Sequence, residues 1–281
     1  MLRFPLKQAV LDSLVRSALD EDSAFNDLTT IATVVSERRG RGALVARESG
    51  VICGVALALN AFRMLDPKVA IRVDAEDGMR VESGTSVLFV NGNARALLSA
   101  ERVALNFLQR LSGIASLTAQ YVAAVQGTGA KILDTRKTTP GWRALEKYAV
   151  RAGGGYNHRM DLASAILVKD NHLAALDGDV ALAVRRAREL APGVQVEVEC
   201  DRLEQVEKAL AAGADVIMLD NMSLDEMRRA AQLVSKRATL EASGGVDLST
   251  VRAVAQTGVD WISVGALTHS APAMDLALDF D

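Results

Sequence analysis

Four cationic side chains gather around two short apolar segments in the middle of the chain. Arg136 and Lys137 directly follow the segment KILDT, and Lys169 ends the segment AILVK. Arg159 lies between the two segments, next to His158. Fixed cations repel one another unless an anion lies between them, and arginine and lysine both suit carboxylate and phosphate groups. These residues predict a cleft for a small ligand with several negative charges.

Carboxylates end two of the later apolar segments. Glu199 is part of VEVEC, and Asp220 closes VIMLD. Opposite a group of cations, such acids suit ribose hydroxyls, a Mg²⁺ ion or an oxocarbenium-like centre on a sugar. Cys200 lies at the end of an apolar strand, and we interpret it as a small buried thiol rather than a nucleophile.

Glycine-rich turns end the last two apolar segments. In barrel proteins, backbone N–H groups and a helix N-terminus at this place commonly bind a phosphate monoester. The residues concerned are Ser243, Gly244, Gly245, Val264, Gly265 and Ala266. Three more consecutive glycines, 153–155, should let backbone N–H groups approach a ligand closely. Cations, acids and phosphate-binding turns together indicate a phosphoribosyl donor and an acidic acceptor as the ligands.

A regular alternation of strands and helices, which begins at Lys131, must position these candidate catalytic and binding residues. Near-continuous apolar strands separated by amphipathic helices, such as 203–213 and 223–235, are typical of a parallel sheet covered by helices. The predicted strands are 131–135, 165–170, 194–200, 215–220, 238–243 and 261–266. Because no Gly-x-Gly-x-x-Gly turn occurs, the pattern favours a β/α barrel, whose strands end at the active site. The alternative is that each ionisable group at a strand end is only a solvated loop charge.

A different pattern precedes this barrel and predicts a separate α+β domain, so that the whole chain has an α/β fold. A helix over about 6–20 leads into short alternating segments, and a helix with apolar residues at helical spacing follows over about 94–126. The predicted strands are 41–48, 51–56, 69–74 and 85–91. We therefore expect an N-terminal domain over 1–112, with the tail from about 270 to 281 packed against it, and a catalytic barrel over 113–269.

The composition fits a cytoplasmic protein with a sizeable core. Hydrophobic residues make up 49% of the chain, but no apolar run reaches the ~20 residues of a membrane helix. The N-terminus lacks the apolar stretch and cleavage site of a signal peptide. A net charge of −3 argues against a nucleic-acid partner. Two cysteines predict neither a disulfide framework nor a zinc site.

Long ordered motifs in the chain resemble the quinolinate phosphoribosyltransferases, which are also called nicotinate-nucleotide pyrophosphorylases (carboxylating). The longest motifs are DTRKTTPGWRALEKYAVRAGGGYNHRMDL (134–162) and LVKDNHL (167–173). DLTT (27–30) and SVGALTHSAPAMDLALDF (263–280) extend the resemblance to both ends of the chain. It implies an N-terminal α/β domain followed by an incomplete β/α barrel of the type II phosphoribosyltransferase kind.

The resemblance also implies the reaction and the binding of its acceptor. Members of the family transfer phosphoribosyl from phosphoribosyl pyrophosphate to quinolinate with loss of carbon dioxide, giving nicotinate mononucleotide and pyrophosphate for de novo NAD biosynthesis. Arg136, Arg159 and Lys169 would meet the quinolinate carboxylates. His158 would help them, and Thr135 would also contact substrate.

Three residues carry the implied catalytic roles. Lys137 would lie near the pyrophosphate, while Glu199 and Asp220 would face the ribose and Mg²⁺, the implied metal cofactor. The turns 243–245 and 264–266 would bind the 5′-phosphate of the donor.

The resemblance also implies a homodimer, or a higher oligomer, in which active sites are shared between subunits. Arg102 on the long helix would enter the site of the partner chain, and the alternative is an exposed arginine paired with Glu101. The chain departs from the family pattern at Asp161 and at Asn26, where glycine is expected. Asp161 would add a negative charge beside Arg159.

Three alternatives fit part of this pattern. A related transferase for nicotinate or another heterocycle would need fewer cations. A molybdenum-linked paralogue of the same fold is expected to lack the complete DTRKTTPG and GGGxNHR motifs. A non-catalytic sensor of anionic metabolites would share the basic pocket but would not need Glu199 and Asp220. Turnover of quinolinate distinguishes the expected transferase from all three.

Overall fold

The computed structural model describes residues 2–281, which form two compact units. The first, unit 1, consists of the chain up to Ala119 together with Ala144–Gly154 and Ala271–Asp281. The second, unit 2, consists of Gln120–Arg143 and Gly155–Ser270. The return of residues 144–154 to unit 1 is a feature that the sequence pattern did not indicate.

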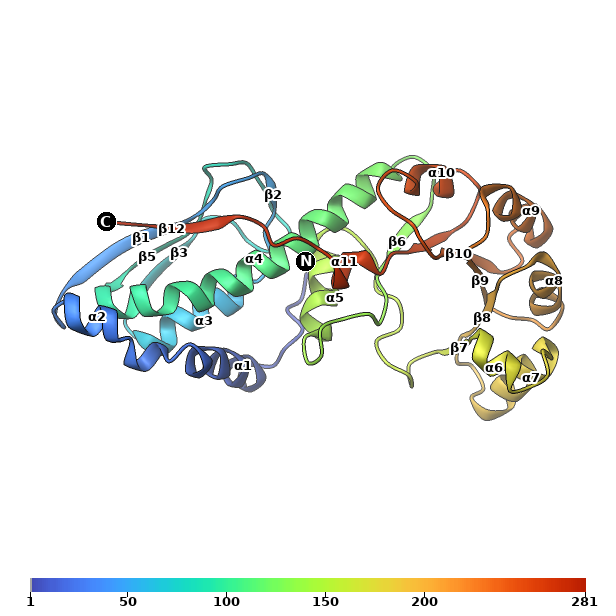
Figure 1. Cartoon of the computed structure of the whole chain (residues 1–281), viewed down its shortest axis with the longest axis horizontal. Helices are drawn as coiled ribbons and strands as arrows, with labels where there is room; N and C mark the ends of the chain where they lie inside the picture. Colours follow the sequence, from blue (N-terminus) through green and yellow to red (C-terminus); the bar gives the residue numbers. More distant parts are fainter. Residues whose placement is uncertain (1) are drawn as a thin grey trace. The chain divides into compact units, whose positions relative to one another are not determined.

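Unit 1 contains an antiparallel sheet with the strand order β12-β1-β5-β3 (Figure 1). Its strands are β1 (Arg39–Ala46), β3 (Ala70–Val73), β5 (Ser86–Asn93) and β12 (Leu276–Phe280). A smaller ladder joins β2 (Gly50–Val51) to β4 (Arg80–Val81). The last strand of the chain pairs with the first, from Gly42 opposite Phe280 to Ala46 opposite Leu276.

The helices of unit 1 are α1 (Gln8–Glu21), η1 (Ala24–Asn26), α2 (Leu28–Thr33), α3 (Val55–Leu65), α4 (Ala94–Ala124) and α5 (Arg143–Ala152), of which α4 ends and α5 begins in unit 2. Leu19 of α1, Phe62 of α3 and Leu108 of α4 are fully buried. The apolar stripe that predicted the long helix therefore packs in a core. None of the described helices is long and apolar enough to cross a membrane.

Helix α3 overturns the strand predicted over 51–56, because the chain becomes helical at Val55. Gly54 precedes the helix with φ +105°, a conformation that favours glycine. The carboxylate of Asp77 accepts the N–H groups of Gly54 and Val55 at 2.8 and 3.0 Å. Asp77 thus caps the helix from a distant point of the chain, where no local pattern reveals it.

Glycines 153 and 154 end helix α5, so the prediction that they approach a ligand is wrong. A Cβ at Gly153 would lie 2.3 Å from the carbonyl oxygen of Ala115 in α4. Gly154 has φ +87°, and its N–H donates to the carbonyl of Arg151 at 3.1 Å. The first glycine permits close helix packing, and the second lets the chain turn at a helix C-terminus.

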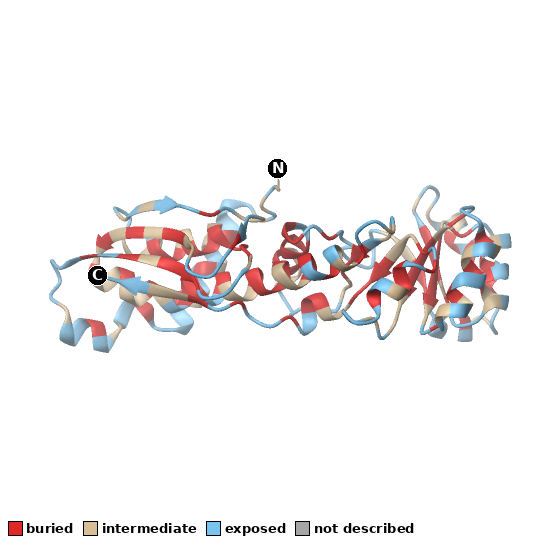
Figure 2. Ribbon diagram, turned by 90° about the horizontal axis from the view of Figure 1, so that it is seen from above, coloured by how far each residue is buried: buried red, intermediate tan, exposed pale blue. Residues whose placement is uncertain are grey.

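Unit 2 contains an all-parallel sheet with the order β6-β11-β10-β9-β8-β7. Its strands are β6 (Lys131–Leu133), β7 (Ile166–Val168), β8 (Val196–Cys200), β9 (Val216–Asp220), β10 (Thr239–Ser243) and β11 (Trp261–Ser263). Its helices are α6 (Asp170–Ala174), α7 (Val180–Leu190), α8 (Leu203–Ala211), α9 (Leu224–Val234), α10 (Val251–Ala255) and α11 (Ala266–His269). Figure 2 shows buried residues along the strands and exposed residues on the outer sides of the helices. The strand order is open between β6 and β7, so the predicted incomplete barrel is confirmed.

Parallel pairing brings the carboxyl ends of these strands to one edge of the sheet. Asp220 lies opposite Ser243, and Leu133 lies opposite Ser263. Beside β6, Tyr156 forms a parallel bridge with Leu133, so the segment before Arg159 runs along the open side of the barrel. This edge is where a β/α barrel carries its active site.

Candidate active site

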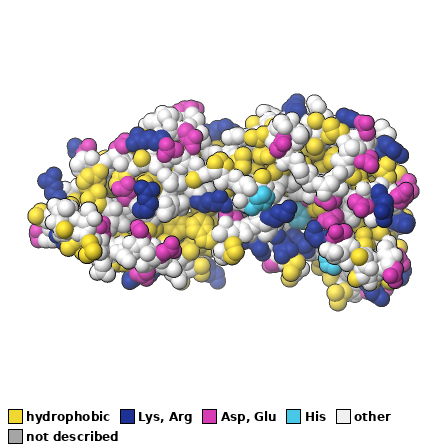
Figure 3. Space-filling view, in the orientation of Figure 1, with side chains coloured by type: hydrophobic (Ala, Val, Ile, Leu, Met, Phe, Trp, Pro, Cys, Tyr) yellow, Lys and Arg dark blue, Asp and Glu magenta, His cyan; other side chains and the backbone are white. Residues whose placement is uncertain are grey.

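A cavity of about 760 Å³ lies at this edge of unit 2. Its lining residues are Thr135, Arg136, Lys137, His158, Arg159, Leu167, Lys169, Asp170, Asn171, Glu199, Met218, Asp220, Asn221, Glu241, Ser243, Gly244, Gly245 and Ser263. The four cations and two acids that the sequence singled out all belong to this set. Figure 3 shows Lys, Arg and His side chains gathered close to Asp and Glu side chains on the visible face of the molecule.

Arg136 and Arg159 offer hydrogen-bond donors inside this cavity. The Nε atom of Arg136 is buried and has no hydrogen-bond partner among residues 2–281. The guanidinium of Arg159 donates to the carbonyl of Ala165 at 3.1 Å. Burial lowers the pKa of Arg159, and the neighbouring charge of Arg136 lowers it further. Two adjacent guanidinium groups of this kind suit a ligand with carboxylate or phosphate groups.

Lys169 connects the cationic side of the cavity to the acidic side. Its Nζ atom lies 2.5 Å from Oε2 of Glu199, at the end of the neighbouring strand β8. Its backbone N–H donates to Nδ1 of His172 at 2.9 Å, at the beginning of helix α6. His172 is exposed and does not line the cavity itself, but its hydrogen bond to Lys169 contacts a residue that does.

The acidic side of the cavity fits a divalent cation. Burial raises the pKa of Asp220, and the charges of Glu199 and Asp170 raise it further. Asn221 donates to the same carboxylate at 2.8 Å. Mg²⁺ usually binds one or two carboxylates together with substrate phosphates, and two carboxylates that repel each other meet this requirement.

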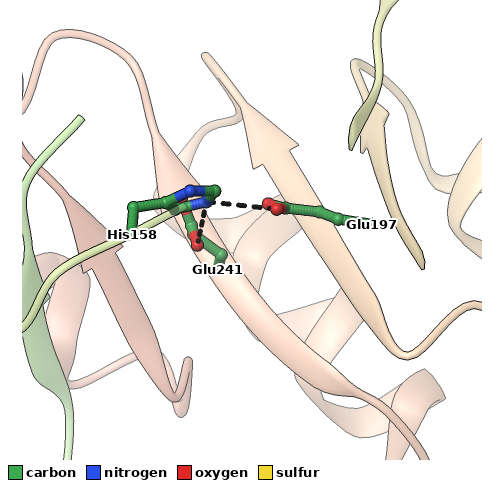
Figure 4. Close-up of side chains that lie close together, drawn as sticks. All are labelled: His158, Glu197 and Glu241. Atoms are coloured by element: carbon green, nitrogen blue, oxygen red, sulfur yellow. Dashed lines mark ion pairs between the residues drawn. The ribbon is translucent and has the colours of Figure 1, made fainter. Parts of the chain in front are cut away.

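The ring of His158 lies against two buried glutamates (Figure 4). Its Nε2 atom is 3.1 Å from Glu197 and 3.4 Å from Glu241, whose side chains are 3% and 0% exposed. Burial lowers the pKa of His158, but the two carboxylates beside the ring raise it. Burial also raises the pKa of Glu197. The three groups therefore titrate together, and because Nδ1 accepts the backbone N–H of Arg159 at 2.8 Å, the proton of the ring lies on Nε2.

Neither Glu197 nor Glu241 is among the site residues that were predicted from the sequence. The sequence does contain a signal for Glu197, because two glutamates alternate with valines in VEVEC (196–200). Alternate residues of a strand share one face, so Glu197 projects on the same side as Glu199. A carboxylate this deep in an apolar strand needs a partner, and the sequence does not reveal that the partner is His158.

The glycine-rich turn after β10 lines the cavity, whereas the turn after β11 does not. Gly244 has φ +95°, and a Cβ there would lie 2.2 Å from Oδ1 of Asn221. Gly245 also has a positive φ of +61°. Residues 264–266 lie behind the lining, where a Cβ at Gly265 would meet the side chain of Lys137 at 3.1 Å. Of the two predicted phosphate turns, residues 243–245 are the ones directly exposed to the cavity.

Two residues flagged by the sequence are not among those that line this cavity. Arg102 is exposed on α4 in unit 1 and is not among the lining residues. The carboxylate of Asp161 accepts the N–H groups of Ala163 and Ser164 at 3.0 and 2.9 Å. These hydrogen bonds lower the pKa of Asp161, and the ionised carboxylate therefore stabilises the turn of the exposed loop to which it belongs.

Neither cysteine of the chain has the properties of a nucleophile. Cys53 and Cys200 are free and buried. Burial raises the pKa of Cys200 to about 12, and the nearby charges of Asp201 and Glu199 contribute. A thiol with so high a pKa is not ionised at neutral pH, which confirms the interpretation of Cys200 as a buried thiol.

Family models of both domains of quinolinate phosphoribosyl transferase match the chain. The N-terminal domain matches residues 27–112 and the C-terminal domain matches residues 114–279. The nicotinate-nucleotide pyrophosphorylase (carboxylating) of Mycobacterium leprae is 48% identical over 94% of this chain and 95% of the relative. The probable nicotinate-nucleotide pyrophosphorylase (carboxylating) of Bacillus subtilis is 44% identical over 96% of this chain and 93% of the relative.

Solved structures match over nearly the full length of the chain. NadC from Streptococcus pyogenes superposes with a TM-score of 0.93 and is 44% identical, with 98% of each chain covered. The nicotinate-nucleotide pyrophosphorylase from Francisella tularensis also gives a TM-score of 0.93, at 38% identity and with 99% of this chain and 98% of the other covered. On the agreement of family models, relatives and solved structures, the chain belongs to the quinolinate phosphoribosyltransferase family.

Proposed function

We propose that this protein transfers the phosphoribosyl group of phosphoribosyl pyrophosphate to quinolinate, releases pyrophosphate and carbon dioxide, and makes nicotinate mononucleotide for de novo NAD biosynthesis. The observation that carries the proposal is the convergence of four cations, two acids and a glycine-rich turn in one cavity. The cations suit a dicarboxylate, and the acids and turn suit a ribosyl phosphate. Full-length relatives named nicotinate-nucleotide pyrophosphorylase (carboxylating) support the same reaction.

The first step forms the bond between quinolinate and ribose. Arg136, Arg159 and Lys169 bind the carboxylates and orient the ring nitrogen, which attacks the anomeric carbon as the bond to pyrophosphate breaks. Positive charge grows on the ribose ring, and Glu199 and Asp220 stabilise it because they lie opposite the cations. Only groups that act on this developing charge lower the barrier of the step.

The second step removes a carboxylate and needs no covalent bond to the enzyme. The electron pair of the bond to the departing carbon dioxide stays on the ring carbon, where the adjacent positively charged nitrogen stabilises it, and this pair then binds a proton. The atoms and charges balance without an oxidant or a reductant. The high pKa of the buried Cys200 thiol is consistent with a reaction that uses no cysteine nucleophile.

The metal cofactor of the proposal is Mg²⁺, held by Glu199 and Asp220. Burial raises the pKa of Asp220 and the repulsion from Glu199 raises it further, and this repulsion supports the pair as ligands of the ion. When bound, the ion supplies positive charge to the pyrophosphate. Lys137, whose side chain also lines the cavity, adds a further positive charge for the same group.

Two further parts of the proposal, the oligomeric state and the location in the cell, rest on the resemblance to the family. We propose a homodimer in which Arg102 of one chain enters the active site of the other, supported by its exposed position on α4. We propose a cytoplasmic location, supported by two cysteines that are free rather than bonded to each other.

The proposal is tested by a product assay with purified protein, quinolinate, phosphoribosyl pyrophosphate and Mg²⁺. We expect nicotinate mononucleotide and carbon dioxide in equal amounts. With nicotinate as acceptor, one charge-paired carboxylate contact is lost, which costs ~2–4 kcal/mol or roughly 30- to 1000-fold in kcat/KM.

Each negative outcome of this assay would indicate a different function for the cavity. Equal kcat/KM values for quinolinate and nicotinate would contradict the assignment of the cations to a dicarboxylate. Binding of quinolinate without any turnover would instead favour a sensor of anionic metabolites.

A further inference from the structure

Arg159 belongs to a segment with almost no regular secondary structure. Residues 155–160 run between α5 and β7, and their only strand-like pairing is the bridge at Tyr156. A guanidinium that recognises a carboxylate must be held to within a fraction of an ångström of its productive place. A loop of this kind does not provide such rigidity by itself, so other groups must hold the backbone of Arg159.

Asp134 holds the backbone just before Arg159. Its buried carboxylate accepts the N–H of His158 at 2.9 Å and the side-chain amide of Asn157 at 2.5 Å. Asp134 directly follows β6, so the loop is tied to the sheet at this point. The tie ends at His158, and one more link is needed to reach the substrate-binding arginine.

The imidazole of His158 provides that link. The backbone N–H of Arg159 donates to Nδ1 of the ring at 2.8 Å. An N–H group directed at Nδ1 requires a free electron pair there, so the proton of the ring resides on Nε2. Nε2 faces Glu197 and Glu241 at 3.1 and 3.4 Å. The ring is thus clamped between two buried acids on one side and the Arg159 backbone on the other.

The same hydrogen bond argues against a metal ion in this cluster. Ligand atoms of His158, Glu197 and Glu241 lie within 4.8 Å of one another, a spacing that could hold a metal. A histidine that binds a metal through Nε2 normally donates a proton from Nδ1 to an acceptor. Here Nδ1 is itself the acceptor, so Nε2 carries the proton and cannot coordinate a metal.

We propose that Glu197 and Glu241 are positioning residues, which hold the His158 ring so that its Nδ1 fixes the backbone of Arg159 for recognition of a quinolinate carboxylate. The inference rests on the proposed function, because it takes quinolinate as the ligand of Arg159. Neither glutamate needs to touch the substrate. Their contact with the His158 ring also explains why two carboxylates persist in an apolar sheet at 3% and 0% side-chain exposure.

The test is steady-state kinetics of Glu197→Gln and Glu241→Gln, singly and together. Glutamine keeps the shape of the side chain, but it removes the charge that holds the ring proton. A displaced Arg159 should raise the KM for quinolinate about 10- to 100-fold, while the KM for phosphoribosyl pyrophosphate and kcat stay within about twofold. The preference for quinolinate over nicotinate should fall in parallel, because the displaced cation is the one that separates them.

Asp215→Asn is the matched control in the same sheet. The carboxylate of Asp215 accepts the N–H of Val196 at 2.8 Å, at the opposite end of strand β8 from Glu199. Its replacement should lower thermal stability without changing the quinolinate KM. If the two glutamine variants behave like this control, with lower stability and an unchanged quinolinate KM, the inference is overturned.

A second measurement tests the clamp without catalysis. The chain has only three histidines, so the side-chain ¹⁵N signals of His158 can be assigned by NMR. At neutral pH we expect a protonated Nε2 and an unprotonated Nδ1 in the wild type. A ring protonated on both nitrogens, or one that binds a divalent cation through Nε2, would overturn the inference.

Failure of the inference and failure of the proposed function give different results. A wild type that does not turn over quinolinate overturns the proposed reaction and, with it, the role given to Arg159. A wild type that does turn it over, combined with glutamine variants of unchanged quinolinate KM, overturns the positioning role alone.

Discussion

The acids at the ends of β8 and β9 are expected to act on the transition state rather than on binding of the acceptor. Glu199→Ala and Asp220→Ala should each lower kcat about 10²- to 10³-fold, because they stabilise charge that develops only as the ribose bond breaks. The quinolinate KM should change much less. Steady-state kinetics with both substrates checks this. A variant with normal kcat and only a raised quinolinate KM would show that these acids bind the acceptor instead.

The Glu199 variant needs a control, because Lys169 lies 2.5 Å from the same carboxylate. Removing Glu199 also releases that lysine, which could alter quinolinate binding indirectly. Burial and the charge of Glu199 raise the pKa of Asp220 and the charge of Lys169 lowers it, but no ion pair joins Asp220 to Lys169, and its hydrogen bond comes from Asn221. Agreement between the two acid variants therefore assigns the loss of kcat to the missing negative charge.

Helix α2 provides a prediction at the scale of an element. Asp27 caps this helix by accepting the N–H of Thr30 at 3.0 Å, and Ser99 of α4 donates to it at 2.9 Å. The side chain of Thr30 and then its backbone lower the pKa of Asp27. A lowered folded pKa means that the ionised cap stabilises the fold above the unfolded pKa of ~3.9 and loses this effect as the pH falls.

Urea unfolding at pH 7 and pH 3 checks the cap. The difference in unfolding free energy between wild type and Asp27→Asn should be larger at pH 7 than at pH 3, because asparagine does not titrate. Asp27 is half-buried, and solvent still screens its charge, so the effect is expected to be modest. The same difference at both pH values would contradict a titrating cap.

Elements with a strong periodic pattern were predictable, and elements that depend on distant contacts were not. The helix expected over about 94–126 is α4, Ala94–Ala124, because its apolar stripe repeats at helical spacing over many turns. Of the strand expected over 51–56, only Val51 lies in a strand, β2, and the chain enters α3 at Val55, where Asp77 caps the first N–H groups. Propensity is a weak guide where a remote side chain completes the helix end.

At the scale of the whole molecule, the proposed homodimer predicts complementation between two inactive chains. Arg102→Ala and Lys169→Ala should each be nearly inactive, because one chain would supply Arg102 to the site that contains Lys169 of the other. After dissociation and mixing, half of the dimers are mixed and each has one intact site of two, so about a quarter of wild-type activity should return.

The complementation requires proof that mixed dimers form, for which two differently tagged chains and sequential purification suffice. Recovered activity in the doubly purified fraction supports a site shared between subunits. Inactive mixed dimers would mean that Arg102 acts within its own chain or not at all. The matched control is a mixture of the Lys169→Ala chain with itself under both tags, which should stay inactive.

The sequence by itself determined the β/α alternation and the cations, acids and glycines that surround the cavity. It could do so because parallel strands bring their carboxyl ends to one edge whatever the details of packing. Only the tertiary structure decided which buried groups meet, such as His158 with Glu241, and that residues 144–154 return to unit 1. These contacts join positions far apart in the chain. Burial makes a partner necessary for each polar group, but the local pattern does not say which one it will be.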